Sequence, residues 1–64
     1  LRSLLGEALS SATPTQARRI RCYYLQGVNI PAISRIEGIA TSVASRSIRA
    51  GLDRMRAYYA RLPS

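Results

Sequence analysis

Arginine is the residue type in this sequence with the clearest chemical potential. Ten arginines and no lysine or histidine stand against three acids, Glu7, Glu37 and Asp53, so the net charge is +7 and the pI is about 11.2. A guanidinium group is planar and always charged, and its N–H donors match phosphate oxygens and the edge of guanine. So large a positive charge on a chain of 64 residues predicts a polyanionic partner.

The sequence contains few residues that could form a catalytic site, a metal site or a phosphate-binding loop. Histidine is absent, the three acids lie far apart in the sequence, and no glycine-rich phosphate loop occurs. The single cysteine, Cys22, cannot form an internal disulfide or a Cys/His metal cluster, and we interpret it as a small apolar residue on a helix. We therefore expect no enzymatic activity, no metal and no cofactor.

The length of the chain fits one small domain, residues 1–64, held together by helix packing. No run approaches the roughly 18 apolar residues of a membrane span, and no signal peptide is evident. The sequence thus predicts no membrane partner and a reducing, cytoplasmic location.

Four helical segments are expected to position the arginines, which makes the predicted fold class all-α. The first, near residues 3–10, has one apolar face formed by Leu4, Leu5, Ala8 and Leu9. We expect this segment to be a short flap packed on the rest, or the tail of a longer parent chain.

The second segment begins with a capping box, in which Thr13 is the N-cap, Pro14 is the first helical residue and Gln16 is the third. Its core positions at helical spacing are Ala17, Ile20 and Tyr24. Gly27 supplies the end of the helix, and Arg19 is expected on a solvated face.

The third segment is short, beginning after Asn29 as N-cap and ending at Gly38. Pro31 is tolerated in its first turn, and Ile33 and Ile36 are expected to point into the core.

The fourth segment is the longest, with Thr41 or Ser42 as its cap and an end near Ala60, before Pro63. Its predicted apolar stripe consists of Ala44, Ile48, Leu52, Met55 and Tyr59. Gly51 is expected to allow the close approach of another helix.

We also expect the C-terminal end of this segment to extend beyond the packed unit. Tyr58 and Tyr59 should lie beyond the packed unit, with Tyr59 continuing the apolar stripe. Leu52, Met55 and Tyr59 would then be available for a homodimer or for a missing part of a parent protein.

Residues of about 29–56 match the helix-turn-helix plan, in which a short helix and a glycine-containing turn precede a longer helix. The first helix of such a pair crosses the DNA backbone, and the second presents its N-terminal residues to base edges in the major groove. Ser34 is small enough for close packing of the two helices, and Gly38 permits the positive φ of the turn.

The motifs together resemble the promoter-binding fourth region of bacterial sigma factors over about residues 9–55. The matching residues are Thr13-Pro14-Thr15-Gln16, Tyr23-Tyr24-Leu25-Gln26-Gly27-Val28-Asn29, Ile33-Ser34, Gly38-Ile39, Ile48 and Leu52. The resemblance implies a four-helix module whose long last helix is the recognition helix for the −35 promoter element and which docks on RNA polymerase. The chain departs from the family pattern at Ser34, Glu37, Ala40 and Ala44.

By matching position, the resemblance implies contacts with double-stranded DNA from two helices. The implied base contacts are Thr41, Ser42, Ser45, Arg46 and Arg49, and the implied phosphate contacts are Asn29 and Arg35. Arg46 is the best candidate for a bidentate guanine contact, with a phosphate contact as its alternative.

Several other interpretations stay open. The DNA-binding domain of a response regulator shares much of this pattern. A module that mainly binds RNA polymerase or an anti-sigma partner would have a similar sequence, and a basic amphipathic helix could lie on an anionic membrane. The chain is either part of a longer factor or a stand-alone sigma-like regulator.

Overall fold

The computed structural model describes residues 4–63, with side chains described from residue 6, and no strand occurs in that range. The elements in chain order are α1 (Leu4–Leu9), α2 (Pro14–Ile20), the π-helical turn η1 (Arg21–Leu25), α3 (Ile30–Glu37) and α4 (Thr41–Ala60). The all-α prediction is confirmed. Residues 1–3 and 64 and the side chains of Leu4 and Leu5, part of the first predicted apolar face, lie outside the described part of the chain.

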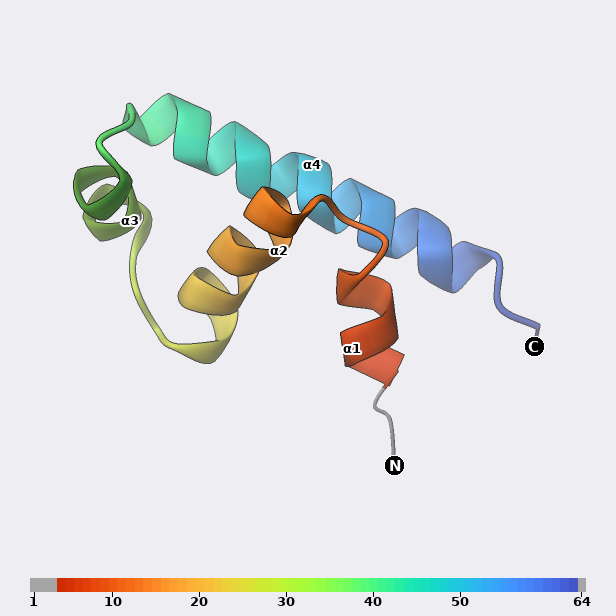
Figure 1. The fold of residues 1–64 in the computed structure, drawn as a ribbon. Coiled ribbons are helices and arrows are strands. Elements are labelled where there is room, and N and C mark those ends of the chain that lie inside the picture. The colour runs from red at the N-terminus through yellow and green to blue at the C-terminus, as the bar shows by residue number, and fades with distance from the viewer. Residues whose placement is uncertain (1–3, 64) are drawn as a thin grey trace.

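Helix α4 organises the fold. It has 20 residues, a length of about 30 Å, and the other three helices pack against it in succession. Helix α3 lies beside the start of α4, α2 crosses its middle and α1 lies under its second half (Figure 1). The buried apolar core comes from all four helices and consists of Ala8, Leu9, Ala17, Ile20, Ile33, Ala44, Ile48 and Met55.

The predicted boundary signals of α2 and α3 are confirmed. The backbone N–H of Gln16 donates to Thr13 Oγ1 at 3.2 Å, and the backbone N–H of Thr13 donates to Gln16 Oε1 at 3.1 Å, which completes the capping box. At α3, the Asn29 side chain accepts the backbone N–H of Ala32 at 2.9 Å. Each cap satisfies a backbone donor that lacks a partner inside the helix.

The second segment stays helical up to Leu25, as predicted, but its last turn before Gly27 is wider than an α-helical turn. The backbone N–H of Gln26 donates to the carbonyl of Arg21, five residues earlier, at 3.1 Å. An extra residue in a turn shifts the angular position of the residues that follow. Tyr24, predicted as a core residue, is consequently 57% exposed.

Gly51 permits a close crossing of α2 over α4, as predicted. A Cβ atom at this position would lie 2.6 Å from Ile20 Cδ1 and 3.0 Å from Gln16 Cβ. These distances are shorter than van der Waals contact, so a larger residue would push the two helices apart.

The second half of α4 belongs to the packed unit, because α1 folds back beneath it. The Tyr58 hydroxyl donates to Glu7 Oε1 at 2.9 Å, and this hydrogen bond raises the pKa of Tyr58. The flap prediction for α1 is confirmed, but the expectation that Tyr58 lies beyond the packed unit is wrong. Met55 is only 7% exposed, which leaves it little surface for a dimer contact, whereas Tyr59 is 39% exposed.

The inward face of α3 differs from the predicted one. Ile33 is 1% exposed, as expected, but Ile36 is 74% exposed. Apart from the half-buried Ala32, the buried and half-buried residues of α3 lie on one face and are Ile30, Ile33, Ser34 and Glu37. Their spacing of three, one and three residues leaves Ile36 about a third of a turn away from the centre of this face.

Candidate nucleic-acid interface

The connection between α3 and α4 has the geometry of a helix-turn-helix. Gly38 adopts the left-handed conformation, with φ of 68° and ψ of 36°, and the backbone N–H of Ile39 returns to the carbonyl of Ser34 at 3.0 Å. Ser34 is buried, and its hydroxyl donates to the carbonyl of Pro31 at 2.8 Å. Ser34 can therefore be buried between α3 and α4, because its hydroxyl group forms a hydrogen bond within α3 itself.

The start of α4 differs from the prediction, because neither Thr41 nor Ser42 caps it. Ala40 is the N-cap residue and makes no side-chain cap hydrogen bond, while its carbonyl accepts the N–H groups of Val43 and Ala44. Thr41 and Ser42 are instead the first two helical residues, and both are exposed. Their hydroxyl groups face solvent at the end of the helix where a recognition helix contacts bases.

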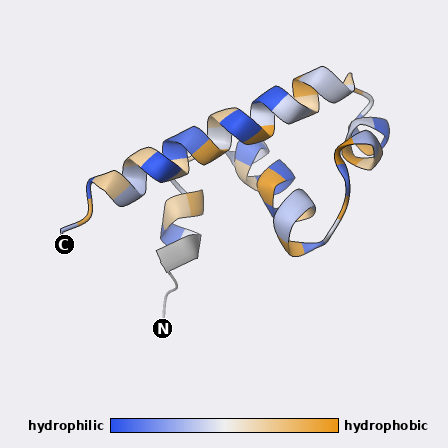
Figure 2. Ribbon diagram, turned by 180° about the vertical axis from the view of Figure 1, so that it is seen from behind, coloured by the Kyte–Doolittle hydropathy of each residue, from blue (hydrophilic) through white to orange (hydrophobic). Residues whose placement is uncertain are grey.

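Four residues at a spacing of four, three and four form one exposed line along α4, which we call the α4 stripe: Ser42, Arg46, Arg49 and Asp53. The opposite side of the helix buries Ala44, Ile48 and Gly51. Hydrophilic segments recur along the whole of α4 in Figure 2, as this two-sided pattern requires. Within the described chain, Arg46 and Arg49 form no ion pair, so both guanidinium groups can serve an external anion.

The other candidate DNA-contacting residues differ in their exposure and in the helix to which they belong. Ser45 is half-buried and lines a hollow together with Tyr23, Tyr24 and Ile30, so it lies at the edge of the exposed face. Asn29 is exposed although its side chain caps α3, and Arg35 is exposed on the same helix. Asn29 and Arg35 thus belong to the first helix of the pair, and Thr41, Ser42, Arg46 and Arg49 belong to the second.

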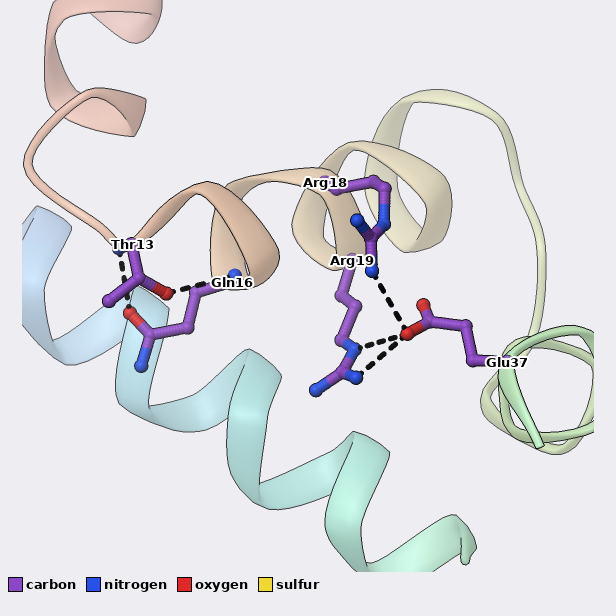
Figure 3. A network of polar contacts seen from close by, with 5 residues as sticks. All are labelled: Thr13, Gln16, Arg18, Arg19 and Glu37. Carbon is purple, nitrogen blue, oxygen red and sulfur yellow. Dashed lines mark hydrogen bonds and ion pairs between the residues drawn. The ribbon is translucent and has the colours of Figure 1, made fainter. Parts of the chain in front are cut away.

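An ion-pair cluster that the sequence did not reveal ties α2 to the end of α3. The guanidinium group of Arg19 donates from Nε at 2.9 Å and from Nη2 at 2.7 Å to Glu37 Oε1, and Arg18 Nη2 donates to the same oxygen at 3.2 Å (Figure 3). The Arg19 side chain is only 12% exposed, so its assignment to a solvated face was wrong. Glu37, noted as a departure from the sigma pattern, is thus a partner for two arginines.

These contacts stabilise the charged form of Glu37. The hydrogen bonds from Arg19 lower the pKa of Glu37, burial opposes them, and the hydrogen bond and charge of Arg18 act in the same direction as Arg19. A carboxyl group with a lowered pKa stabilises the fold above its unfolded-state pKa, and this contribution is lost as the pH falls through the folded-state value.

We expect Glu37→Gln to lower the free energy of unfolding by about 1 kcal/mol at neutral pH, because Arg19 would lose its charged partner. The difference between the variant and the wild type should shrink as the pH falls below the unfolded-state pKa of glutamate and through the lowered pKa of Glu37 in the folded protein. Urea unfolding followed by circular dichroism at several pH values measures both effects.

Asp53→Asn is the matched control, because Asp53 pairs with Arg56 on the exposed surface, with side chains that are 61% and 79% exposed. An exposed pair contributes little, so this variant should change the stability by less than about 0.5 kcal/mol. Equal losses for the two variants, or a Glu37 effect that persists at low pH, would show that the cluster does not stabilise the fold through its charges.

A second surface feature is apolar and lies beside η1. Three adjoining hollows meet at Tyr24 and Leu52. The most apolar of them has a volume of about 250 Å³ and is lined by Leu9, Ile20, Tyr24, Leu25 and Leu52. Tyr24 also stacks edge-on against Tyr23, with ring centroids 4.7 Å apart. The wide turn of η1 thus presents Tyr24 and Leu25 on the surface, 57% and 61% exposed.

Among residues 4–63, no three side chains of the metal-binding types gather at one place, and none of the helices is both long and apolar enough to cross a membrane. Comparison of the chain with protein-family models, with curated proteins and with solved structures finds no significant match.

Proposed function

We propose that this chain is a sequence-specific double-stranded DNA-binding domain that acts in transcription initiation or regulation and is not an enzyme. The observation that carries the proposal is the α4 stripe, where Ser42, Arg46 and Arg49 stand on one exposed face of the second helix of a helix-turn-helix. A helix placed in this way can lie in the major groove, where arginine donates to the O6 and N7 atoms of guanine.

The rest of the chain fits this role. The net charge of +7 favours association with any DNA duplex, and Asn29 and Arg35 on α3 would hold the phosphate backbone while α4 contacts the bases. The resemblance to the fourth region of sigma factors favours promoter DNA in the bacterial cytoplasm as the target. A response-regulator type of transcription regulator would use the same helices.

Titration of DNA duplexes with the protein at several salt concentrations tests the proposal. With about five phosphate contacts, a plot of log K against log salt should have a slope of about −4 to −5. Arg49→Ala should lower the affinity for the preferred duplex about tenfold, the loss expected for one base contact.

Arg54→Ala is the matched control, since Arg54 is an exposed arginine of the same helix that lies off the α4 stripe. This variant should leave the affinity and the slope close to those of the wild type. A flat salt response, no binding at about 50 mM salt, or equal effects of the two variants would refute DNA binding through the stripe.

A second candidate function is the binding of a protein such as RNA polymerase or an anti-sigma partner. The observation that favours it is the exposed apolar surface at Tyr24 and Leu52, because exposed apolar patches mark interaction sites. A homodimer through Leu52 and Tyr59 would use the same surface. This candidate replaces the first if the wild type ignores DNA but binds purified bacterial RNA polymerase in a Tyr24-dependent way.

A further inference from the structure

Asp53 occupies an unexpected place for an acid in a protein proposed to bind DNA. It follows Arg49 by one helical turn on the α4 stripe, and its side chain is 61% exposed. The other two acids have contacts within the fold, since Glu7 accepts the Tyr58 hydroxyl and Glu37 accepts two arginines. Asp53 is the acid of the described chain that stands on the face assigned to DNA.

The nearest partner of Asp53 is an arginine that would otherwise extend the basic surface. Arg56 Nη1 lies 3.4 Å from Asp53 Oδ1, and both side chains line the same hollow as Arg49. On the exposed face of α4, this pair carries no net charge and occupies the fourth and fifth turns, whereas Arg46 and Arg49 make the second and third turns positive. On this face of the helix, the uncompensated positive charge therefore ends at Arg49, while the exposed Arg54 lies off the α4 stripe.

We propose that Asp53 is a specificity-determining residue, an inference that rests on the DNA-binding function proposed above. Its carboxylate repels phosphate and offsets the positive charge of Arg56, so the DNA-contacting part of α4 ends at Arg49. A non-specific complex depends on phosphate contacts alone, and it would gain from each further arginine along the backbone. Asp53 removes that gain. Specificity is the difference between the affinities for the preferred duplex and for random duplexes, so a residue that weakens the non-specific complex raises the specificity.

The test compares Asp53→Asn with Glu7→Gln, because both substitutions add one positive unit to the net charge and only the first lies on the α4 stripe. The amide oxygen introduced at position 7 can still accept the Tyr58 hydroxyl, and circular dichroism checks that both variants are folded. Affinities are measured for the duplex that the wild type selects from a random pool and for duplexes of random sequence.

Asp53→Asn should raise the affinity for random duplexes about three- to tenfold, the effect of roughly one phosphate contact. It should change the affinity for the selected duplex by less than about twofold, and the slope of log K against log salt on random duplexes should become steeper by about 1. Glu7→Gln should leave the ratio of the two affinities unchanged. Adding Arg56→Ala to Asp53→Asn should restore the wild-type slope, because the released arginine makes the additional contact.

Three results would overturn the inference. If Asp53→Asn and Glu7→Gln have the same effect, or if Asp53→Asn raises both affinities equally, the total charge matters and the position of the acid does not. If Asp53→Asn weakens only the selected duplex and changes the preference at one base pair, Asp53 accepts a hydrogen bond from a cytosine amino group instead. If the wild type binds no duplex at all, the proposed function itself fails.

Discussion

Replacing Ile33 with alanine is expected to destabilise the domain by about 2 to 5 kcal/mol. Ile33 is 1% exposed and is the largest fully buried side chain of the described residues, so the truncation would leave a cavity among α3 and its neighbours. A chain of 64 residues has a total stability of about 3 to 10 kcal/mol. The variant should therefore lose a large fraction of its total stability, and Ile48→Ala in the same core should behave similarly.

The matched control is Ile36→Ala, which makes the same chemical change three residues later on the same helix. Ile36 is 74% exposed, so its truncation should change the stability by less than about 0.5 kcal/mol. Urea unfolding followed by circular dichroism compares the two variants directly. Similar losses at both positions would mean that Ile36 is covered in solution and that α3 is oriented differently.

Replacing Arg46 with alanine is expected to relax sequence preference, with a loss of about 1 to 3 kcal/mol of discrimination at one base pair. Arg46 is exposed on the α4 stripe, and its Nε donates to the carbonyl of Ser42 at 3.4 Å. That single long contact leaves the terminal nitrogens of the guanidinium group for guanine. Selection of bound sequences from a random duplex pool measures the change at each position.

Arg35→Ala is the comparison, because Arg35 is equally exposed but lies on α3, the helix expected to cross the backbone. Phosphate contacts position a protein without distinguishing bases. This variant should weaken binding to all duplexes alike and reduce the salt slope by about 1. If Arg35→Ala alters the preferred bases and Arg46→Ala does not, the roles of the two helices are reversed.

Local signals predicted the boundaries of the helices well. The capping box at Thr13 and Gln16, the Asn29 cap and the glycine at position 38 each act through hydrogen bonds or backbone angles within a few residues. Such features are present in the sequence wherever the segment ends up in the fold. The Gly51 crossing was also predictable, because a glycine inside a long helix needs a reason to be there.

Apart from the cap of α4, which is Ala40 and not Thr41 or Ser42, the errors concern packing between segments. The wide turn of η1 displaced Tyr24 from the core, and no local pattern announced it. The Arg19–Glu37 contact joins residues 18 positions apart, and the Tyr58–Glu7 hydrogen bond joins residues 51 apart. Helical periodicity describes one segment at a time, so it cannot indicate which exposed-looking charge or ring meets a partner from another helix.

The continuity of α4 constrains how this domain can change in evolution. One unbroken helix begins directly after the turn that follows α3, and its second half provides the surface against which α1 packs (Figure 1). An inserted residue near its middle would rotate one half against the other by about 100° and lengthen the helix by about 1.5 Å. The buried faces of the two halves would then no longer point toward the same core. Substitutions on the outer face do not change the rotation of one half relative to the other. New contact specificities on α4 are therefore accessible by exchange of side chains, and insertions are tolerated only in the connections between helices.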